Sequence, residues 1–145
     1  MKNETVVLKK LEDTLDLGKR IADGLKPGDV IGLTGPLGAG KTALTQAIAR
    51  GLGVTERLAS PTFTVLMEYV SGRIPMCHFD VYRVHDPDEL FEIGFEEYIG
   101  GDWVCVIEWA DLIEDILPAD TKWIDLNYGD LDDERICEIR WEPKA

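Results

Sequence analysis

Hydrophobic and polar positions along the chain follow two periods, one typical of buried strands and one typical of helices. Val30 to Thr34 and Trp103 to Ile107 are near-continuous apolar runs, as expected for strands that are buried on both faces of a sheet. After a short first strand at Thr5 to Leu8, apolar or small residues recur at helical spacing from Leu11 to Leu25. The turn Lys26 to Asp29 then ends the predicted helix.

The remaining pattern predicts two antiparallel pairs of strands and further helical segments. A strand from Thr64 to Val70 leads through a tight turn into a second strand from Ile74 to Asp80, and the alternating tail from Thr121 to Trp141 turns around Tyr128 to Asp130. A helix is expected to begin near Asp86, where a proline and several acids stand together. These elements predict an α/β fold with a mixed central sheet.

The segment between the Val30 to Thr34 strand and the next helix, about Lys41 to Arg50, carries the strongest chemical signal. Gly35, Gly40, Lys41 and Thr42 match the G-x-x-x-x-G-K-[ST] motif of a phosphate-binding loop (P-loop). In such a loop, backbone N–H groups and the positive end of the following helix hold phosphates. The residues expected to bind nucleotide are therefore Leu37, Gly38, Ala39, Gly40, Lys41 and Thr42. Lys41 would neutralise the β and γ phosphates, and the Thr42 hydroxyl would bind Mg²⁺.

The motif refines the fold prediction to a P-loop NTPase-like sandwich: a mixed central sheet flanked by helices, with a C-terminal antiparallel strand pair. The alternative is a glycine-rich turn before a helix with no phosphate-binding role. The buried strand before the motif and the helix after it argue against this alternative. A length of 145 residues fits one domain, spanning residues 1–145. No Asn-Lys-x-Asp string typical of guanine recognition is present. ATP and ADP are the expected nucleotides.

A P-loop enzyme also needs an acid at the end of a neighbouring strand to hold the metal, and two residues qualify. Glu108 follows the most apolar strand, and Asp80 follows the run Met76 to Phe79. The two carboxylates could share Mg²⁺ and its waters, because this ion prefers oxygen ligands. For either acid alone, a salt bridge at the end of a strand is the alternative.

Other residues near these motifs have both a chemical and an ordinary structural interpretation. Ser60, Thr62 and Thr64 supply hydroxyl groups on a loop that could sense the γ-phosphate, or they could serve as turn and strand residues. Trp109 either lines the site or packs beside it. His78 could act as an acid or base, although phosphoryl transfer depends mainly on positioning and electrostatics.

Composition and charge narrow the classes of partner. A net charge of -13 disfavours unaided binding of nucleic acid, because a protein that grips a phosphate backbone normally has a basic face. The acids between Asp86 and Glu97 could instead attract a basic protein, or they could form a solvated surface. Three dispersed cysteines predict buried thiols. The absence of a long apolar run predicts a cytoplasmic protein with no membrane partner.

The order of several short motifs along the chain resembles one known family. The motifs are Pro27-Gly28-Asp29-Val30-Ile31, Leu37-Gly38-Ala39-Gly40-Lys41-Thr42, Ser60-Pro61-Thr62-Phe63-Thr64, His78-Phe79-Asp80-Val81-Tyr82-Arg83 and Val106-Ile107-Glu108-Trp109. Together they resemble the bacterial TsaE (YjeE) family, the ATPase of tRNA threonylcarbamoyladenosine (t6A) biosynthesis. The resemblance extends from about Thr14 to Tyr128.

That resemblance implies a role for each motif. Thr42 and Glu108 would hold Mg²⁺, Asp80 would be needed for hydrolysis together with Lys41, Thr62 would belong to a switch-like loop near the γ-phosphate, and Trp109 would lie close to the nucleotide. The family's members act on the TsaD and TsaB heterodimer, while TsaD modifies adenosine 37 of tRNAs that read codons beginning with A. This chain would therefore contact tRNA only indirectly.

Two residues depart from the pattern that is common in the family. Pro36 stands where aspartate is common, and Ala110 stands where proline or glycine is frequent. Proline fixes φ and removes an N–H, which could change phosphate affinity or nucleotide exchange.

A small-molecule kinase uses the same loop but needs a second pocket. A nucleotide-dependent binding module without meaningful turnover is the third possibility.

Overall fold

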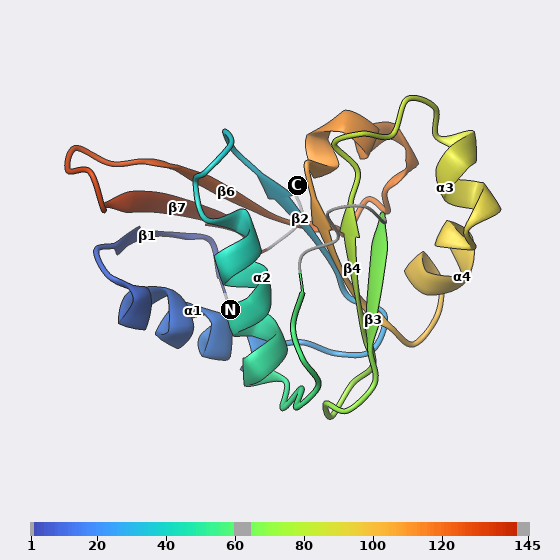
Figure 1. Cartoon of the computed structure of the whole chain (residues 1–145), viewed down its shortest axis with the longest axis horizontal. Helices are drawn as coiled ribbons and strands as arrows, with labels where there is room; N and C mark the ends of the chain where they lie inside the picture. The colour runs from blue at the N-terminus through green and yellow to red at the C-terminus, as the bar shows by residue number, and fades with distance from the viewer. Residues whose placement is uncertain (1, 60–64, 142–145) are drawn as a thin grey trace.

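A mixed sheet forms the centre of the protein. The computed structural model describes residues 2–59 and 65–141, and within them seven strands lie in the order β1-β7-β6-β2-β5-β4-β3. The strands are β1 (Glu4–Leu8), β2 (Val30–Thr34), β3 (Leu66–Tyr69), β4 (Met76–Asp80), β5 (Val104–Glu108), β6 (Lys122–Tyr128) and β7 (Arg135–Arg140). Figure 1 shows their arrangement.

Parallel pairing holds the middle of this sheet together, and antiparallel pairing extends it at both edges. β2 pairs in parallel with β5 on one side and with β6 on the other, and β4 pairs in parallel with β5. β3 is antiparallel to β4, and β7 is antiparallel to both β6 and β1. The predicted C-terminal antiparallel pair is confirmed. It is also continuous with the central sheet, because β6 joins β2.

Helices cover both faces, as the predicted sandwich requires. α1 (Leu11–Asp23) and α2 (Lys41–Gly51) pack on one face, and the short helices α3 (Asp88–Glu92) and α4 (Phe95–Ile99) lie on the other side (Figure 1). The 3₁₀ helix η1 (Ala110–Ile116) follows β5 and contributes to the same apolar cluster as α3 and α4. No helix within the described residues is long and apolar enough to cross a bilayer.

Several boundaries differ from those predicted, for local reasons. α1 ends at Asp23 rather than near Leu25, with Gly24 as its C-cap. The expected strand from Ile74 begins only at Met76. The strand predicted from Thr64 is described from Leu66, and Thr64 itself lies outside the described residues.

The α3 and α4 region also departs from the predicted single helix. Pro87 is the N-cap of α3, so the helix begins at Asp88, two residues after the predicted start at Asp86. Gly94 then adopts a left-handed conformation with φ 85°, which separates α3 from α4. The sequence pattern predicted neither α4 nor η1.

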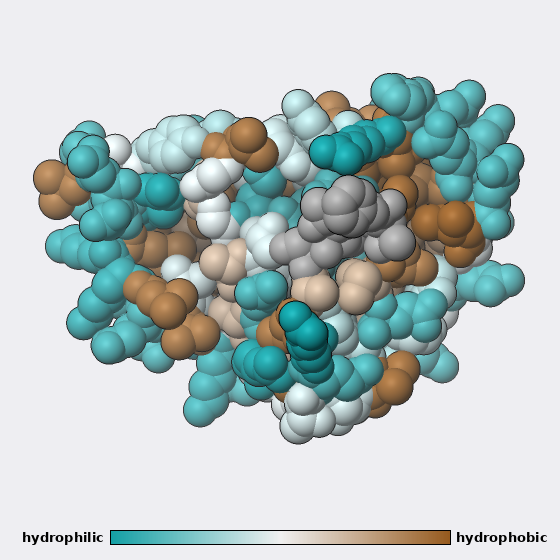
Figure 2. All heavy atoms as spheres, in the orientation of Figure 1, coloured by the Kyte–Doolittle hydropathy of each residue, from teal (hydrophilic) through white to brown (hydrophobic). Residues whose placement is uncertain are grey.

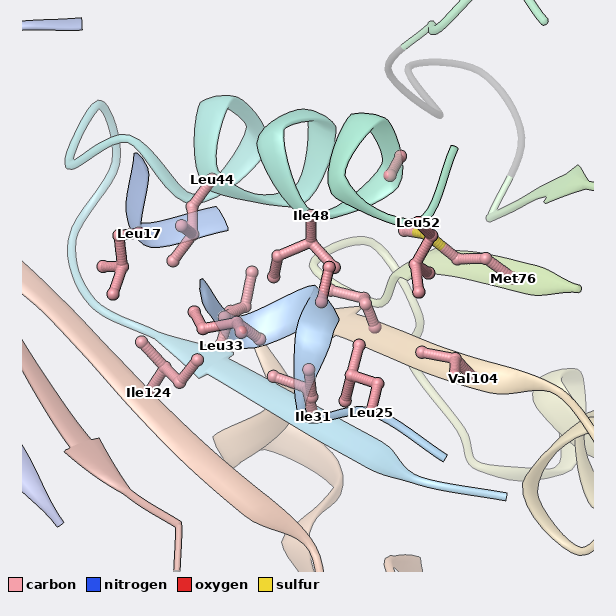
Figure 3. Packing of buried hydrophobic residues seen from close by; sticks show 14 of the residues in the cluster. Leu17, Leu25, Ile31, Leu33, Leu44, Ile48, Leu52, Met76, Val104 and Ile124 are labelled. Carbon is pink, nitrogen blue, oxygen red and sulfur yellow. The ribbon is translucent and has the colours of Figure 1, made fainter. Parts of the chain in front are cut away.

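Burial follows the alternation of side chains along the central strands. Ile31 and Leu33 of β2 point to the α2 face and pack against Leu44, Ile48 and Leu52 (Figure 3). On the neighbouring β5, Val104 and Val106 belong to the same cluster, whereas Cys105 and Ile107 belong to the cluster under α3 and α4. Both faces of these strands are therefore buried, as their apolar runs predicted.

The three cysteines are buried and unoxidised, which confirms the prediction of buried thiols. Cys77 of β4 and Cys105 of β5 are opposite each other in the sheet, with their sulfur atoms 2.9 Å apart. Burial raises the pKa of the Cys137 thiol to about 12. A thiol with a raised pKa and no solvent access is a poor nucleophile.

Two glycines allow α1 and α2 to pack in close contact. A Cβ atom added to Gly18 of α1 would lie 2.4 Å from the Ala47 Cβ and 2.6 Å from its carbonyl carbon in α2. A Cβ added to Gly51 would lie 2.7 Å from the Ala22 Cβ. Neither position has space for a side chain at the present helix separation, so this contact fixes α2, and the P-loop before it, against α1.

We expect Gly18→Val to lower the free energy of unfolding by about 1–3 kcal/mol, because the added methyl groups overfill the contact between the helices. Urea unfolding measures the change. Lys19→Ala, at the adjacent exposed position of α1, is the matched control and should change stability little. A Gly18→Val protein as stable as the wild type would contradict the tight contact.

Candidate functional site

The loop between β2 and α2 depends on glycines with positive φ angles, which other residues rarely adopt. Gly35 has φ 130°, and a Cβ there would lie 2.0 Å from the Leu126 carbonyl oxygen of β6. Gly40 has φ 99° and is the N-cap of α2. The motif glycines thus allow the chain to leave the sheet beside β6 and to start a helix whose first N–H groups face the loop.

Lys41, the first residue of α2, is held under this loop. Its ammonium donates to the carbonyl oxygens of Gly35 (2.6 Å) and Pro36 (2.9 Å). The side chain is buried, and burial lowers the pKa of Lys41, an effect that nearby carboxylates, led by Glu108, partly oppose. An ammonium has three N–H donors, so after these two bonds one donor remains for a phosphate oxygen.

The predicted acids meet at the ends of adjacent strands. Asp80 is the last residue of β4, Glu108 is the last residue of β5, and the two are paired across the sheet. The Thr42 hydroxyl donates to the Glu108 carboxylate, with distances of 3.0 and 3.1 Å to the two oxygens. Parallel pairing therefore brings both acids to the edge of the sheet at which the P-loop starts.

Asp80 has a more open environment than Glu108. It is half-buried, and its Oδ1 accepts a hydrogen bond from the Tyr82 backbone N–H at 3.0 Å. Burial is the main reason that the pKa of Asp80 is raised, and the negative charge of Glu108 adds to it, whereas the Tyr82 hydrogen bond opposes it. A carboxyl group with a raised pKa at a pocket is a candidate for proton exchange with a bound ligand.

Trp109 is the residue that covers Lys41. The Lys41 ammonium lies 3.8 Å from the centre of the indole ring, within the range of a cation–π contact. The Tyr82 ring also packs against the indole, with 4.7 Å between ring centres and an interplanar angle of 41°. Among the described residues, Trp109 is the only one other than glycine with a positive φ, 62°. This left-handed conformation turns the chain sharply from β5 into η1.

A pocket of about 290 Å³ brings most of the predicted site residues together. It is lined by Leu37, Gly38, Gly40, Lys41, Thr42, Ala43, Asp80, Glu108 and Trp109. Ala39 is fully buried in the core instead, so any contribution to binding comes from its backbone. Thr62, with Ser60 and Thr64, lies outside the described residues. The roles assigned to the residues in this pocket remain predictions.

A second pocket, of about 410 Å³, lies on the other side of the P-loop. It shares Gly38 and Gly40 with the first pocket and is otherwise lined by Leu8, Lys9, Lys10, Leu11, Thr14, Asp133 and Arg135. Apolar and basic side chains from the β1–α1 junction thus face the β6–β7 hairpin. Sequence reasoning missed this pocket, because its walls are far apart along the chain.

The β6–β7 hairpin also fastens the P-loop from outside. The Tyr128 hydroxyl donates to the Leu37 carbonyl oxygen, and Arg135 Nη2 lies 3.5 Å from the Gly38 carbonyl oxygen. The Arg135 guanidinium lies 5.1 Å from the centre of the Tyr128 ring. Sequence analysis placed Tyr128 in a hairpin turn, whereas it is the last residue of β6. No motif could show that this strand end contacts the loop.

The donors in the first pocket fit Mg²⁺ better than a transition metal. Thr42 and Glu108 offer oxygen atoms that already lie within hydrogen-bond distance of each other. Across residues 2–59 and 65–141, no cluster of three or more histidine, cysteine, aspartate and glutamate side chains could hold a metal. Mg²⁺ commonly binds through one or two protein oxygens, with water and substrate phosphates completing the shell.

Comparison with known proteins agrees with this architecture. The family model described as "Threonylcarbamoyl adenosine biosynthesis protein TsaE" matches residues 8–137. The tRNA threonylcarbamoyladenosine biosynthesis protein TsaE of Bacillus subtilis is 47% identical over 124 residues, which cover 86% of this chain and 77% of that protein. The Rickettsia bellii protein of the same name is 35% identical over 140 residues, 96% of each chain.

A solved structure shows the same fold. The crystal structure of Bacillus subtilis YdiB superposes with a TM-score of 0.80 at 39% identity, and the match covers 95% of this chain and 84% of that chain. The predicted P-loop NTPase fold, with its mixed sheet and flanking helices, is confirmed.

We expect Tyr128→Phe to speed amide exchange of Leu37 to Gly40 by about 2–10-fold, because one hydrogen bond contributes about 0.5–1.5 kcal/mol to holding the loop closed. Hydrogen–deuterium exchange read by mass spectrometry measures the effect. Tyr98→Phe is the matched control, since it removes a hydroxyl that donates to Glu68 away from the loop. Equal acceleration by both variants, or none by Tyr128→Phe, would show that the Tyr128–Leu37 hydrogen bond does not stabilise the P-loop.

Proposed function

The chain belongs to the TsaE family of tRNA threonylcarbamoyladenosine biosynthesis, and from this premise we propose that it is a magnesium-dependent ATP hydrolase of that pathway. One observation carries the proposal. Lys41 and Thr42 of the P-loop line the same pocket as the two carboxylates Asp80 and Glu108. A phosphate cradle next to two acids at strand ends is the arrangement that phosphoryl transfer uses.

Lys41 supplies the positive charge for the phosphates. The Gly35 and Pro36 carbonyl oxygens hold its ammonium under the loop, where its third N–H donor can reach a phosphate oxygen. Burial disfavours the charged form of Lys41, and a negatively charged phosphate oxygen would stabilise it further. Binding of the β and γ phosphates is thus favoured by the charge of Lys41 and by the N-terminus of α2.

Thr42 and Glu108 would hold the Mg²⁺ ion of the metal–nucleotide complex. When bound, the ion neutralises charge that develops on the transferred phosphoryl group. Thr42 is placed at the first turn of α2 and Glu108 at the end of β5, so a helix and a strand would each provide one ligand. The hydrogen bond that now joins them would give way to shared coordination.

Asp80 would position the attacking water. It lines the pocket and is partly accessible, and its backbone is fixed by pairing with Glu108 across the sheet. Its carboxylate can accept a hydrogen bond from water and, with a raised pKa, can take a proton more readily than an ordinary aspartate. Thr62, outside the described residues, keeps its assignment from the family resemblance as a γ-phosphate neighbour.

The nucleoside half of ATP or ADP would occupy the second pocket. The two pockets meet at Gly38 and Gly40, so a nucleotide lying across the P-loop reaches both. Leu8 and Leu11 offer apolar contact for a base, and Lys10 and Arg135 add positive charge near the α-phosphate end. Trp109 would border the phosphates on the opposite side, beside Lys41.

The partners of the proposed cycle are TsaD and TsaB, with tRNA contacted only through them. The α3–α4 region supports a protein partner, because Phe91 and Ile93 are exposed there among six exposed acids between Asp86 and Glu97. Figure 2 shows hydrophobic surface interspersed with hydrophilic surface over these helices. An acidic face of this kind suits a basic protein surface and repels an RNA backbone.

We expect Thr14→Phe to weaken ADP binding about 10-fold or more, because the larger ring fills the nucleoside pocket. Tripolyphosphate, which has no nucleoside, should bind both proteins equally. Isothermal titration calorimetry gives both affinities. Leu15→Phe, at the exposed neighbouring position of α1, is the matched control and should leave ADP affinity unchanged. If Thr14→Phe weakened both ligands equally, the nucleoside would not bind here.

Purified protein should release inorganic phosphate from ATP slowly, and adding TsaD and TsaB should change the rate. Lys41→Ala and Glu108→Ala should lower turnover by about 100-fold or more. Asp80→Ala should lower it by about 100-fold while ADP binding persists. Glu138→Ala, an exposed acid on β7, is the control and should behave like the wild type. Phosphate release and multiple-turnover t6A formation are the measurements.

The same assay separates the alternatives. A small-molecule kinase would transfer the labelled γ-phosphate to an acceptor rather than to water. If the protein were a binding module without turnover, the Asp80→Ala variant would support t6A formation as well as the wild type does. Full hydrolysis by Glu108→Ala, or t6A formation over many cycles without this protein, would refute the proposed function.

A further inference from the structure

His78 is a buried residue that contacts Glu108, one of the two proposed metal ligands lining the pocket. It is the third residue of β4, its side chain is 1% exposed, and its Nε2 atom lies 2.5 Å from Glu108 Oε2. In the parallel pair of β4 and β5, His78 is opposite Val106, two residues before Glu108. Both side chains therefore point to the α2 face of the sheet, where they meet diagonally.

The chemistry of this contact fixes its direction. A carboxylate that binds Mg²⁺ is ionised and can only accept hydrogen bonds, so in that state the Nε2 atom of His78 donates to Glu108. Thr42 donates to the same carboxylate from α2, at 3.0 and 3.1 Å. Glu108 is thus contacted by His78 from the neighbouring strand β4 and by Thr42 from α2. Its side chain is 4% exposed.

We propose that His78 is a positioning residue that holds the Glu108 carboxylate in the orientation that receives the Mg²⁺ ion. The inference rests on the proposed function, in which Glu108 binds that ion. With Oε2 engaged by His78, Oε1 is the oxygen left for the metal or its water. Mg²⁺ demands near-ideal octahedral geometry, so a carboxylate that rotates freely would bind it less well.

The buried environment strengthens this role. A carboxylate removed from water must be hydrogen-bonded, and when Thr42 turns to the metal, the His78 bond remains to stabilise Glu108. Partners that hydrogen-bond to metal ligands in this way typically change metal affinity by about 10–100-fold. A histidine that only filled space in the core would affect stability without affecting Mg²⁺.

Two isosteric variants separate these roles. In His78→Gln the side-chain amide nitrogen takes approximately the place of Nε2 and can still donate to Glu108. In His78→Asn the amide reaches only the Nδ1 position. Cys77→Ala, the adjacent buried position on β4 that faces the opposite cluster, is the control for a change in packing. Affinity for a fluorescent ADP derivative is measured in EDTA and across a Mg²⁺ titration.

In EDTA, all variants should bind the derivative like the wild type. The Mg²⁺ concentration that gives half of the maximal effect should rise about 10–100-fold in His78→Asn, much less in His78→Gln, and not at all in Cys77→Ala. In a Glu108→Ala background, His78→Asn should have no further effect on the titration. That result is expected only if His78 acts through Glu108.

Three results would overturn the inference. The first is an unchanged Mg²⁺ midpoint in His78→Asn, and the second is equal changes in His78→Asn and His78→Gln. The third is a loss of nucleotide affinity of the same size in EDTA and in Mg²⁺. If Mg²⁺ had no effect on nucleotide binding by the wild type, the proposed function would fail together with the inference. A normal wild-type titration with an unaffected His78→Asn variant would remove the inference alone.

Discussion

The parallel alignment of β2 with β5, and of β5 with β4, is the constraint on which the site depends. Parallel strands end at the same edge of a sheet, so the residues that follow them are brought together. Leu33 of β2 is paired with Glu108, and Glu108 is paired with Asp80. One set of backbone hydrogen bonds therefore places the start of the P-loop beside both carboxylates. Because the three strands are buried on both faces, neither their register nor this placement can shift independently of the core.

The resulting concentration of charge explains why a cation belongs in the proposed cycle. Lys41 is surrounded by the carboxylates of Glu108, Asp111, Asp80 and Asp125, and their attraction opposes the effect of burial on its pKa. A triphosphate placed in the same pocket would repel those acids. A divalent ion between phosphate and carboxylate would convert that repulsion into attraction. The proposed positioning of Glu108 by His78 would then act on the ligand that is most enclosed by protein.

Sequence alone was informative where the signal is local. The apolar runs of β2 and β5, the P-loop, and the acids that end β4 and β5 were all placed correctly along the chain. It was less informative for short elements such as α4, in which five residues are too few to show a helical period. Gly94, whose left-handed conformation separates α3 from α4, was not recognised as a break in the predicted helix.

Long-range contacts were the other gap, because no local pattern encodes them. Tyr128 was predicted to be a turn residue, yet it ends β6 and its hydroxyl contacts the Leu37 carbonyl oxygen in the P-loop. His78 read as one of two histidines of uncertain use, and only the pairing of β4 with β5 shows that it reaches Glu108. The second pocket has the same origin, since α1 and the β6–β7 hairpin are separated by most of the chain.

The close contact of α1 and α2 through Gly18 and Gly51 has a consequence for how the sequence can diverge. Neither glycine can gain a side chain unless the helices move apart, and Ala47, which faces Gly18, can become smaller only as a glycine. Drift at this contact is therefore confined to very few residue types. α1 forms part of the wall of the second pocket, and the P-loop that borders both pockets leads into α2. A substitution that moved the helices apart would therefore change the distance between that wall and the P-loop. Selection on nucleotide binding would then act on residues that never touch the nucleotide.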